Sequence, residues 1–384
     1  MSSLARPKAI TISLLVLLYC FGLISVLAEN EEQRSIRGNH QLASSDPRKL
    51  RATLTEQSGE QNAKMPILFA MGQGTTGTRT LFHAMCHLNV TGVHYGQGCF
   101  KVERARDLSH NEIVAIQAQH DLVHLTNDLA KCAGRVGKSC PLKEALAILH
   151  EIKEGVARVI FSGTVDFIAD TPYPHLFSFV NEAMHHARPG LEPLYMMTER
   201  NAHSWAVRRI AMHSEHVFCR YYFDLELEDL PKFDAEHPDH DPLDWDHCIK
   251  YAARPTPVEE AVATDVFVTL EQLVREAKDN PNRMQRLVAR TRSAYERYQK
   301  KCLEMKNLIY TYDFFKQNER TKNEHLAIDL YERLFNSNML PPHIMEALDS
   351  AGVSILDTED PKNRGILTPK KVGGMFINTV MKMK

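Results

Sequence analysis

Residues 65–88 read MPILFAMGQGTTGTRTLFHAMCHL, and this stretch decides the fold class. It opens with a continuous apolar run, which is typical of a strand buried on both faces of a parallel sheet. A glycine-rich segment follows at 72–78. The apolar residues after it recur at helical spacing: Leu81, Phe82, Met85 and Leu88. The stretch therefore predicts a strand, a glycine-rich turn and a helix, in that order.

The glycine-rich turn has the composition of an anion site. Gly72, Gly74 and Gly77 tolerate positive φ, so successive backbone N–H groups can converge on one phosphate. The positive end of the following helix points to the same place. We therefore predict that a nucleotide phosphate binds to Gly74, Thr75, Thr76, Gly77, Thr78, Arg79 and Thr80.

Strand and helix patterns alternate beyond the turn. Helical periodicity covers 111–129 and 142–156, while 158–162, 194–198 and 307–312 are predicted strands. Strands that alternate with helices indicate a parallel sheet. We therefore expect an α/β fold with a central parallel sheet flanked by helices.

The N-terminal segment has the composition of a targeting signal. Residues 9–28 are almost entirely apolar, with Arg6 and Lys8 before them and acidic residues after them. This pattern predicts either a cleaved signal peptide or a signal anchor within 1–28. We expect the protein in the secretory pathway, either secreted or as a single-pass type II membrane protein of the Golgi, with no other membrane contact.

Residues 29–64 are polar without an apolar period, so they predict a stem or linker. Within it, 48–51 read RKLR and resemble the RxLR host-targeting motif of secreted pathogen effectors. A solvated basic tetrapeptide is the alternative interpretation. We expect the folded domain at 65–340 and a C-terminal extension at 341–384.

Charge and cysteine content restrict the partners and the compartment. The chain has 46 basic and 48 acidic residues, so no global positive field exists to hold nucleic acid, and we expect none. In an oxidising lumen Cys132 and Cys140 would form the easiest bridge, and the odd number of cysteines beyond Cys20 leaves at least one thiol unpaired. Asn89 begins a glycosylation sequon.

Two blocks of the chain resemble the sulfotransferase family. The segment GQGTTGTRTL at 72–81 is similar to the family's GLPRTGTRSL loop, which cradles the 5′-phosphosulfate. Asp170, Pro172 and Phe177 resemble the family's D-x-P-x-x-x-x-F stretch. The segment TERNAHSWAVRR at 198–209 resembles the strand-then-arginine element that binds the 3′-phosphate.

The resemblance implies a P-loop nucleoside triphosphate hydrolase-like architecture of the sulfotransferase type. It also implies transfer of sulfate from 3′-phosphoadenosine 5′-phosphosulfate, the co-substrate, to a hydroxyl of a carbohydrate or tyrosyl acceptor. Arg200, Ser204 and Arg208 are then the expected 3′-phosphate ligands, with Arg209 as an alternative to Arg208.

His94 is the expected general base, because this branch of the family often has a histidine there and imidazole titrates near neutral pH. Asp166 and Asp170 are expected to orient the base or the acceptor. No metal is expected. The segment 233–247 contains histidines and aspartates, but their spacing matches no standard metal site, and the composition predicts a solvated loop.

Two departures leave other functions open. Thr75 stands where the family's loop usually has a lysine or arginine that stabilises the leaving phosphate, so turnover is in question. A secreted, non-catalytic protein with the same fold is therefore the alternative. A P-loop kinase is disfavoured, because Thr78 follows Gly77 where such a loop needs lysine.

Overall fold

The computed structural model describes residues 66–87, 90–99, 108–135, 140–238, 240–252 and 266–313. The predicted targeting segment, stem, RKLR tetrapeptide, Asn89 and C-terminal extension lie outside these residues. Within the described part, no helix combines the length and the apolar character that crossing a bilayer requires.

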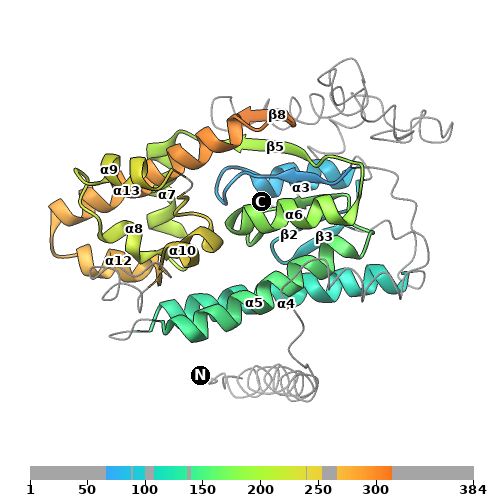
Figure 1. Ribbon diagram of the computed structural model, residues 1–384, viewed down its shortest axis with the longest axis horizontal. Coiled ribbons are helices and arrows are strands. Elements are labelled where there is room, and N and C mark those ends of the chain that lie inside the picture. The colour runs from blue at the N-terminus through green and yellow to red at the C-terminus, as the bar shows by residue number, and fades with distance from the viewer. Residues whose placement is uncertain are drawn as a thin grey trace, which may run out of the picture. The chain divides into compact units, whose positions relative to one another are not determined.

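A six-stranded sheet forms the centre of the fold (Figure 1). Every pair of neighbouring strands is parallel except the β2–β3 hairpin at one edge. The predicted α/β class with a mostly parallel central sheet is therefore confirmed. In spatial order the strands are β3 (Gln97–Cys99), β2 (Gly92–His94), β4 (Phe167–Ala169), β1 (Leu68–Ala70), β5 (Leu194–Glu199) and β8 (Leu308–Asp313).

Strand β1 lies inside the sheet because both of its faces are apolar. All three of its residues are fully buried, and Phe69 pairs with Ile168 of β4 on one side and Tyr195 of β5 on the other. A strand in this position needs a continuous apolar run. Because β1 lies between β4 and β5, the residues that follow those two strands flank the glycine-rich turn.

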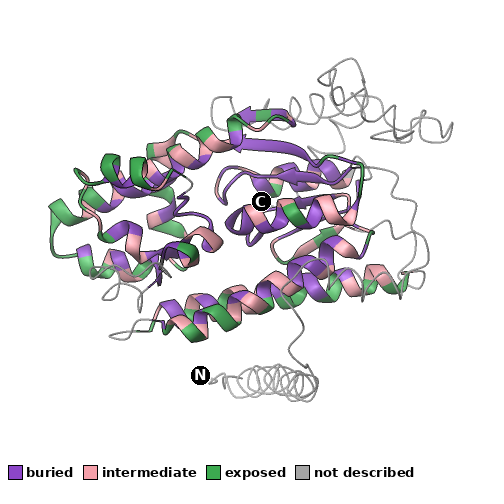
Figure 2. Cartoon of the chain, viewed as in Figure 1, coloured by how far each residue is buried: buried purple, intermediate pink, exposed green. Residues whose placement is uncertain are grey.

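Helices pack against the sheet and against one another and bury their apolar faces, as Figure 2 shows. They are α3 (Thr78–His87), α4 (His110–Ala133), α5 (Leu142–Phe161), α6 (Phe177–Ala187), α7 (Ala202–Met212), α8 (Arg220–Asp224), α9 (Leu230–Glu236), α10 (Trp245–Ala252), α12 (Leu270–Ala277) and α13 (Pro281–Leu303), with a 3₁₀ turn, η2, at Tyr173–Leu176. A second, antiparallel sheet pairs β6 (Val217–Cys219) with β7 (Phe267–Thr269).

The long helices α4 and α5 pack closely against each other. A capping box formed by Ser109 and Glu112 starts α4. A β-carbon at Gly155 of α5 would lie 2.8 Å from Leu122 Cδ2 of α4, so the absence of a side chain there permits the close approach. The predicted helices at 111–129 and 142–156 are confirmed.

The predicted strand at 158–162 is wrong, because most of this segment is the last turn of α5. The helix buries Ile152, Val156, Val159 and Ile160 on one side, which is helical spacing. A short apolar run that contains β-branched residues, such as Val159 and Ile160, cannot be distinguished from a buried strand by composition. The strand of this region is β4, and the predicted strands at 194–198 and 307–312 are confirmed as β5 and β8.

The predicted solvated loop at 233–247 is also wrong. Its first residues belong to α9 and its last to α10, and between them His240, Asp241 and Asp244 are buried. The two aspartates hydrogen-bond locally: Asp241 Oδ1 accepts from the Leu243 N–H, and Asp244 Oδ1 accepts from the Asp246 N–H. The His240 ring makes no hydrogen bond to the described residues, and burial lowers the pKa of His240 to about 3, so the ring is neutral.

Three disulfides pair six of the seven described cysteines: Cys86–Cys99, Cys132–Cys140 and Cys219–Cys248. The predicted Cys132–Cys140 bridge is therefore confirmed, and it closes the connection between α4 and α5. Cys302 of α13 is a buried free thiol. The structure thus accounts for the unpaired cysteine that the odd count required.

Candidate functional site

The glycine-rich turn at 71–77 is held by contacts with its neighbours. Thr76 Oγ1 donates to the Gln73 carbonyl at 2.6 Å and lies 2.8 Å from Thr198 Oγ1 of β5. Trp205 Nε1 of α7 donates to the Gly74 carbonyl at 3.0 Å. These bonds fix the turn against β5 and α7, so its shape is set before any ligand binds.

The backbone of the turn is arranged as an anion site. Gly77 has φ 102° and Thr75 φ 74°; the latter is a strained conformation for a β-branched residue. Among the residues that the structure describes, the N–H groups of Gly74, Thr75 and Gly77 have no hydrogen-bond acceptor. Free N–H groups around a left-handed turn, next to the N-terminus of α3, form a concavity that suits an anion.

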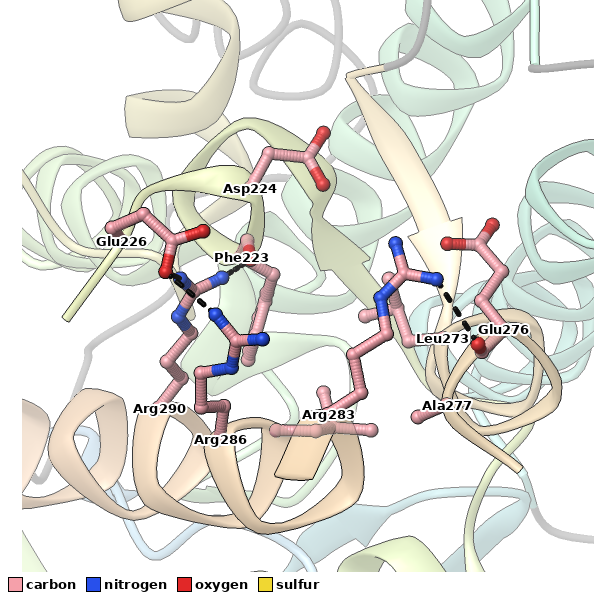
Figure 3. A pocket seen from close by; sticks show the side chains of 10 residues that line it. Phe223, Asp224, Glu226, Leu273, Glu276, Ala277, Arg283, Arg286 and Arg290 are labelled. Atoms are coloured by element: carbon pink, nitrogen blue, oxygen red, sulfur yellow. Dashed lines mark hydrogen bonds and ion pairs between the residues drawn. The ribbon is translucent and has the colours of Figure 1, made fainter. Parts of the chain in front are cut away.

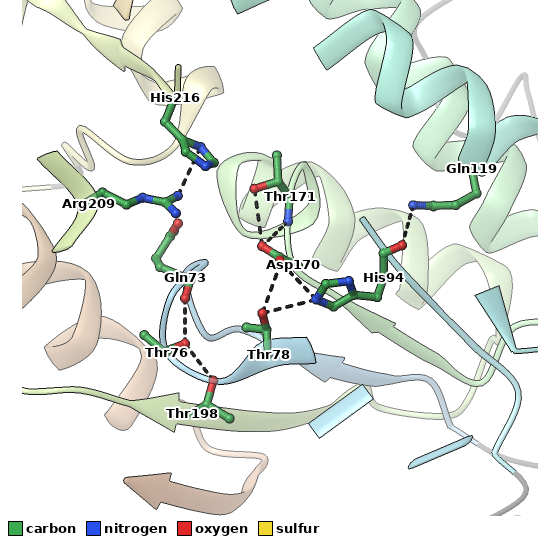
Figure 4. Close-up of polar contacts among 10 residues, drawn as sticks. All are labelled: Gln73, Thr76, Thr78, His94, Gln119, Asp170, Thr171, Thr198, Arg209 and His216. Atoms are coloured by element: carbon green, nitrogen blue, oxygen red, sulfur yellow. Dashed lines mark hydrogen bonds and ion pairs between the residues drawn. The ribbon is translucent and has the colours of Figure 1, made fainter. Parts of the chain in front are cut away.

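His94, Asp170 and Thr78 meet beside the turn (Figure 4). His94 Nε2 lies 3.0 Å from Asp170 Oδ2 and 3.3 Å from Thr78 Oγ1, which donates to Asp170 Oδ2 at 3.1 Å. The side chains of His94 and Asp170 are only 6% and 15% exposed. The three residues come from the ends of β2 and β4 and the start of α3, which the sheet order brings together.

The Asp170 carboxylate determines how His94 can act. Burial alone would raise the pKa of Asp170, but His94, the Thr171 N–H and Arg209 together hold it well below its usual range. The ionised carboxylate requires a proton on His94 Nε2. In neutral His94 the free lone pair is then on Nδ1, which is buried without a partner among the described residues. Asp170 therefore fixes the orientation and the tautomer of the His94 ring.

Arg200 reaches the turn from the end of β5. Its Nη1 donates to the Thr75 carbonyl at 3.1 Å, and its Nε donates to Ser204 Oγ at 3.1 Å. The side chain of Asn201 caps α7 by accepting from the Ser204 N–H. Two of the expected 3′-phosphate ligands, Arg200 and Ser204, therefore lie together at the turn.

Three other expected site residues do not join this cluster. Asp166 precedes β4 whereas Asp170 follows it, so the two lie at opposite ends of the strand, and Asp166 pairs with Arg188 at 3.0 Å. Its expected role beside the base is therefore not supported. Arg79 on α3 and Arg208 on α7 point to solvent.

Arg208 was the expected ligand and its neighbour Arg209 the alternative, and Arg209 is the residue that faces the turn. It is 1% exposed, and its guanidinium lies 5.6 Å from the Trp205 ring. Residues four apart share a face of a helix. Because Trp205 is an apolar residue four positions before Arg209, it indicates that Arg209, and not Arg208, lies on the buried face of α7.

The histidines near Arg209 are kept neutral. Burial lowers the pKa of His175 to about 4, with Arg209 contributing, and burial and the same cation lower that of His216. His216 Nδ1 lies 3.1 Å from Arg209 Nη2 and can accept its hydrogen bond. His213, Glu215 and His216 also have the spacing of metal ligands, but the guanidinium beside them opposes a cation.

A cavity of about 140 Å³ lies elsewhere, between α8, α12 and α13 (Figure 3). Its arginines are already partnered: Arg286 with Glu226 at 2.9 Å, Arg290 with the Phe223 carbonyl and Glu226, and Arg283 with the Glu276 carbonyl at 3.2 Å. Asp224, Glu226 and Glu276 also line this cavity, so its arginines already face several carboxyl groups, and we place the candidate site at the turn.

Comparison with known proteins does not identify a relative. No protein-family model matches the chain, and no curated protein or solved structure matches it at a significant level. The interpretation of the site therefore depends on its geometry.

Proposed function

We propose that the protein has a P-loop sulfotransferase architecture and transfers sulfate from 3′-phosphoadenosine 5′-phosphosulfate to a hydroxyl of a carbohydrate or tyrosyl acceptor. One observation carries the proposal. Arg200, the expected 3′-phosphate ligand, contacts the Thr75 carbonyl of the turn expected to hold the 5′-phosphosulfate. A nucleotide with phosphates at both ends of its ribose would bridge two such anion sites.

The donor would bind through two sets of contacts. The free N–H groups of the turn and the start of α3 would hold the 5′-phosphosulfate. Arg200 and Ser204 would hold the 3′-phosphate, because a guanidinium and a hydroxyl together donate several hydrogen bonds to one phosphate. In the structure these two side chains already hydrogen-bond to each other, which supports a preformed subsite.

The reaction would be an in-line displacement at sulfur. The acceptor oxygen forms a bond to sulfur while the bond from sulfur to the 5′-phosphate oxygen breaks, and the phosphate keeps the electron pair. The acceptor's proton passes to His94, and Asp170 stabilises the imidazolium that results. The products are a sulfate ester and adenosine 3′,5′-bisphosphate.

A second candidate function is favoured by Thr75. A protein that binds the nucleotide without turning it over would keep the turn and Arg200 and lose the loop cation. The RKLR tetrapeptide, as a host-targeting signal, would suit such a secreted protein. Three disulfides support an oxidising compartment for both candidates.

The first experiment measures nucleotide binding by the purified full-length protein. We expect adenosine 3′,5′-bisphosphate to raise the melting temperature, because a ligand that binds only the folded state stabilises it. Arg200→Ala should abolish this shift, whereas the matched control Arg208→Ala, at an exposed arginine, should retain it. A shift with ATP and Mg²⁺ but none with the bisphosphate would favour a kinase and sink the proposal.

The second experiment tests turnover with labelled sulfate donor and a panel of glycan and tyrosyl peptide acceptors. Transfer that requires His94 supports the enzyme. Bisphosphate binding without transfer to any acceptor would favour the non-catalytic candidate.

A further inference from the structure

Arg209 is a buried arginine that contacts the glycine-rich turn. It is 1% exposed, and a β-carbon on Gly74 would lie 2.7 Å from its Nη1 and 3.4 Å from its Nη2. The guanidinium therefore lies against the backbone of the turn. Trp205 holds both partners, because its indole N–H binds the Gly74 carbonyl while its ring lies beside Arg209.

The charge of Arg209 is not neutralised by a direct ion pair within the described residues. Its Nη2 contacts the neutral His216 ring, and its Nε has no hydrogen-bond partner there. The charged groups that face it are Asp170 and Glu215. Asp170 already accepts from Thr78 and the Thr171 N–H and contacts His94. Removing a guanidinium from water is strongly unfavourable unless an anion compensates.

A second buried donor lies beside Arg209. The Gln73 side chain extends from the turn toward Arg209 in Figure 4, and its Nε2 also has no acceptor among the described residues. Buried polar groups are nearly always hydrogen-bonded, so two donors without acceptors at one place indicate a missing acceptor. The two donors and the N–H groups of the turn all suit an anion.

We propose that Arg209 supplies the positive charge that Thr75 lacks and binds the 5′-phosphate of the nucleotide at the turn. This inference rests on the proposed function. When the bond between sulfur and the 5′-phosphate oxygen breaks, the phosphate gains one negative charge. A guanidinium fixed beside that oxygen stabilises the leaving group, as a loop lysine would. Arg200 and Arg209 then serve opposite ends of the same ligand.

Nucleotides with one phosphate separate the two roles. We would titrate the full-length protein with adenosine 5′-monophosphate and with adenosine 3′-monophosphate by calorimetry. Arg209→Gln should weaken binding of the 5′-monophosphate by about tenfold or more, the effect of a lost charge-assisted hydrogen bond. Its affinity for the 3′-monophosphate should be unchanged. Arg200→Ala should show the reverse, and Arg208→Gln, one residue away on the exposed face, should affect neither.

The outcomes distinguish the two proposals. If the wild type binds neither monophosphate nor the bisphosphate, the proposed function fails and this inference fails with it. If the wild type binds them and Arg209→Gln binds the 5′-monophosphate equally well, only this inference is overturned. If Arg209→Gln does not fold, NMR of the wild-type protein replaces the titration of the variant. The Arg209 Nε–H resonance is observed, and it is assigned by its absence in Arg209→Lys. It should shift with the 5′-monophosphate, and an unshifted resonance at saturation overturns the inference.

Discussion

Two arginine clusters in this protein look alike in composition and differ in what surrounds them. In the cavity between α8, α12 and α13, Arg286 and Arg290 contact Glu226. At the glycine-rich turn, Arg200 contacts a carbonyl oxygen and Arg209 a neutral histidine. The arginines of the first cluster therefore pair directly with a carboxylate, whereas Arg209 at the turn makes no direct ion pair with any residue that the structure describes. The number of arginines therefore says less about a ligand site than the partners of each guanidinium.

The largest expected effect tests whether the turn supports chemistry as well as binding. His94→Ala should reduce the rate of sulfate transfer by about 10²–10⁴-fold, the usual contribution of a general base. Affinity for adenosine 3′,5′-bisphosphate should remain, because His94 binds no phosphate in our proposal. Rate and affinity are measured on the same preparation, and an unchanged rate would remove His94 from the mechanism.

The next effect contrasts the two arginine clusters directly. Arg200→Ala should weaken binding of the bisphosphate by about 10–100-fold, because a charge-assisted hydrogen bond to the ligand is lost. Arg286→Ala in the other cluster should leave this affinity unchanged. Calorimetry on both variants makes the comparison, and equal losses in the two would show that general charge, not a specific site, attracts the nucleotide.

Asp244 is a buried ionisable group that, unlike Arg209, can avoid a buried charge by being neutral. Burial, with Asp241 nearby, raises its pKa to about 7, so the folded state keeps the carboxyl protonated at a pH where the unfolded chain has lost the proton. The contribution of Asp244 to the free energy of unfolding is greatest below the pKa that its carboxyl has in the unfolded chain, and it is lost as the pH rises toward 7. Asp244→Asn should therefore stabilise the protein relative to wild type by roughly 1–3 kcal/mol at pH 8 and by little at pH 4.

Chemical denaturation at the two pH values measures this difference. A stabilisation that does not grow with pH would contradict the raised pKa. Arg209 cannot become neutral in the same way. Burial lowers its pKa only to about 10, so the guanidinium stays charged at neutral pH.

The smallest effect concerns stability without ligand. Arg209→Met removes the buried charge and nearly keeps the volume, so the free energy of unfolding of the ligand-free protein should be unchanged or higher by about 1 kcal/mol. The bisphosphate should then stabilise this variant less than wild type. A large loss of stability without ligand would mean that Arg209 is mainly structural.

The class of fold and most of the turn could be predicted from local patterns. The apolar run of β1, the glycines after it and the helical spacing after those required no knowledge of distant residues, because strand burial, turn conformation and helix periodicity are local properties. The Cys132–Cys140 bridge was predictable for the same reason. The errors at 158–162 and 233–247 arose where composition suits two environments, and packing against distant elements decided between them.

The members of the site depended on contacts between residues far apart in the chain. From the sequence alone, Asp166 and Asp170 are equivalent candidates. In the fold they lie at opposite ends of β4, and only Asp170 lies beside His94. Arg208 and Arg209 are neighbours in the chain but lie on different faces of α7. Arg209 is on the face that packs against the turn and is buried, whereas Arg208 is exposed. The burial and the charge partners of a side chain are set by packing between residues far apart in the chain. The sequence can therefore indicate candidate site residues, but only the tertiary structure shows which of them lie together.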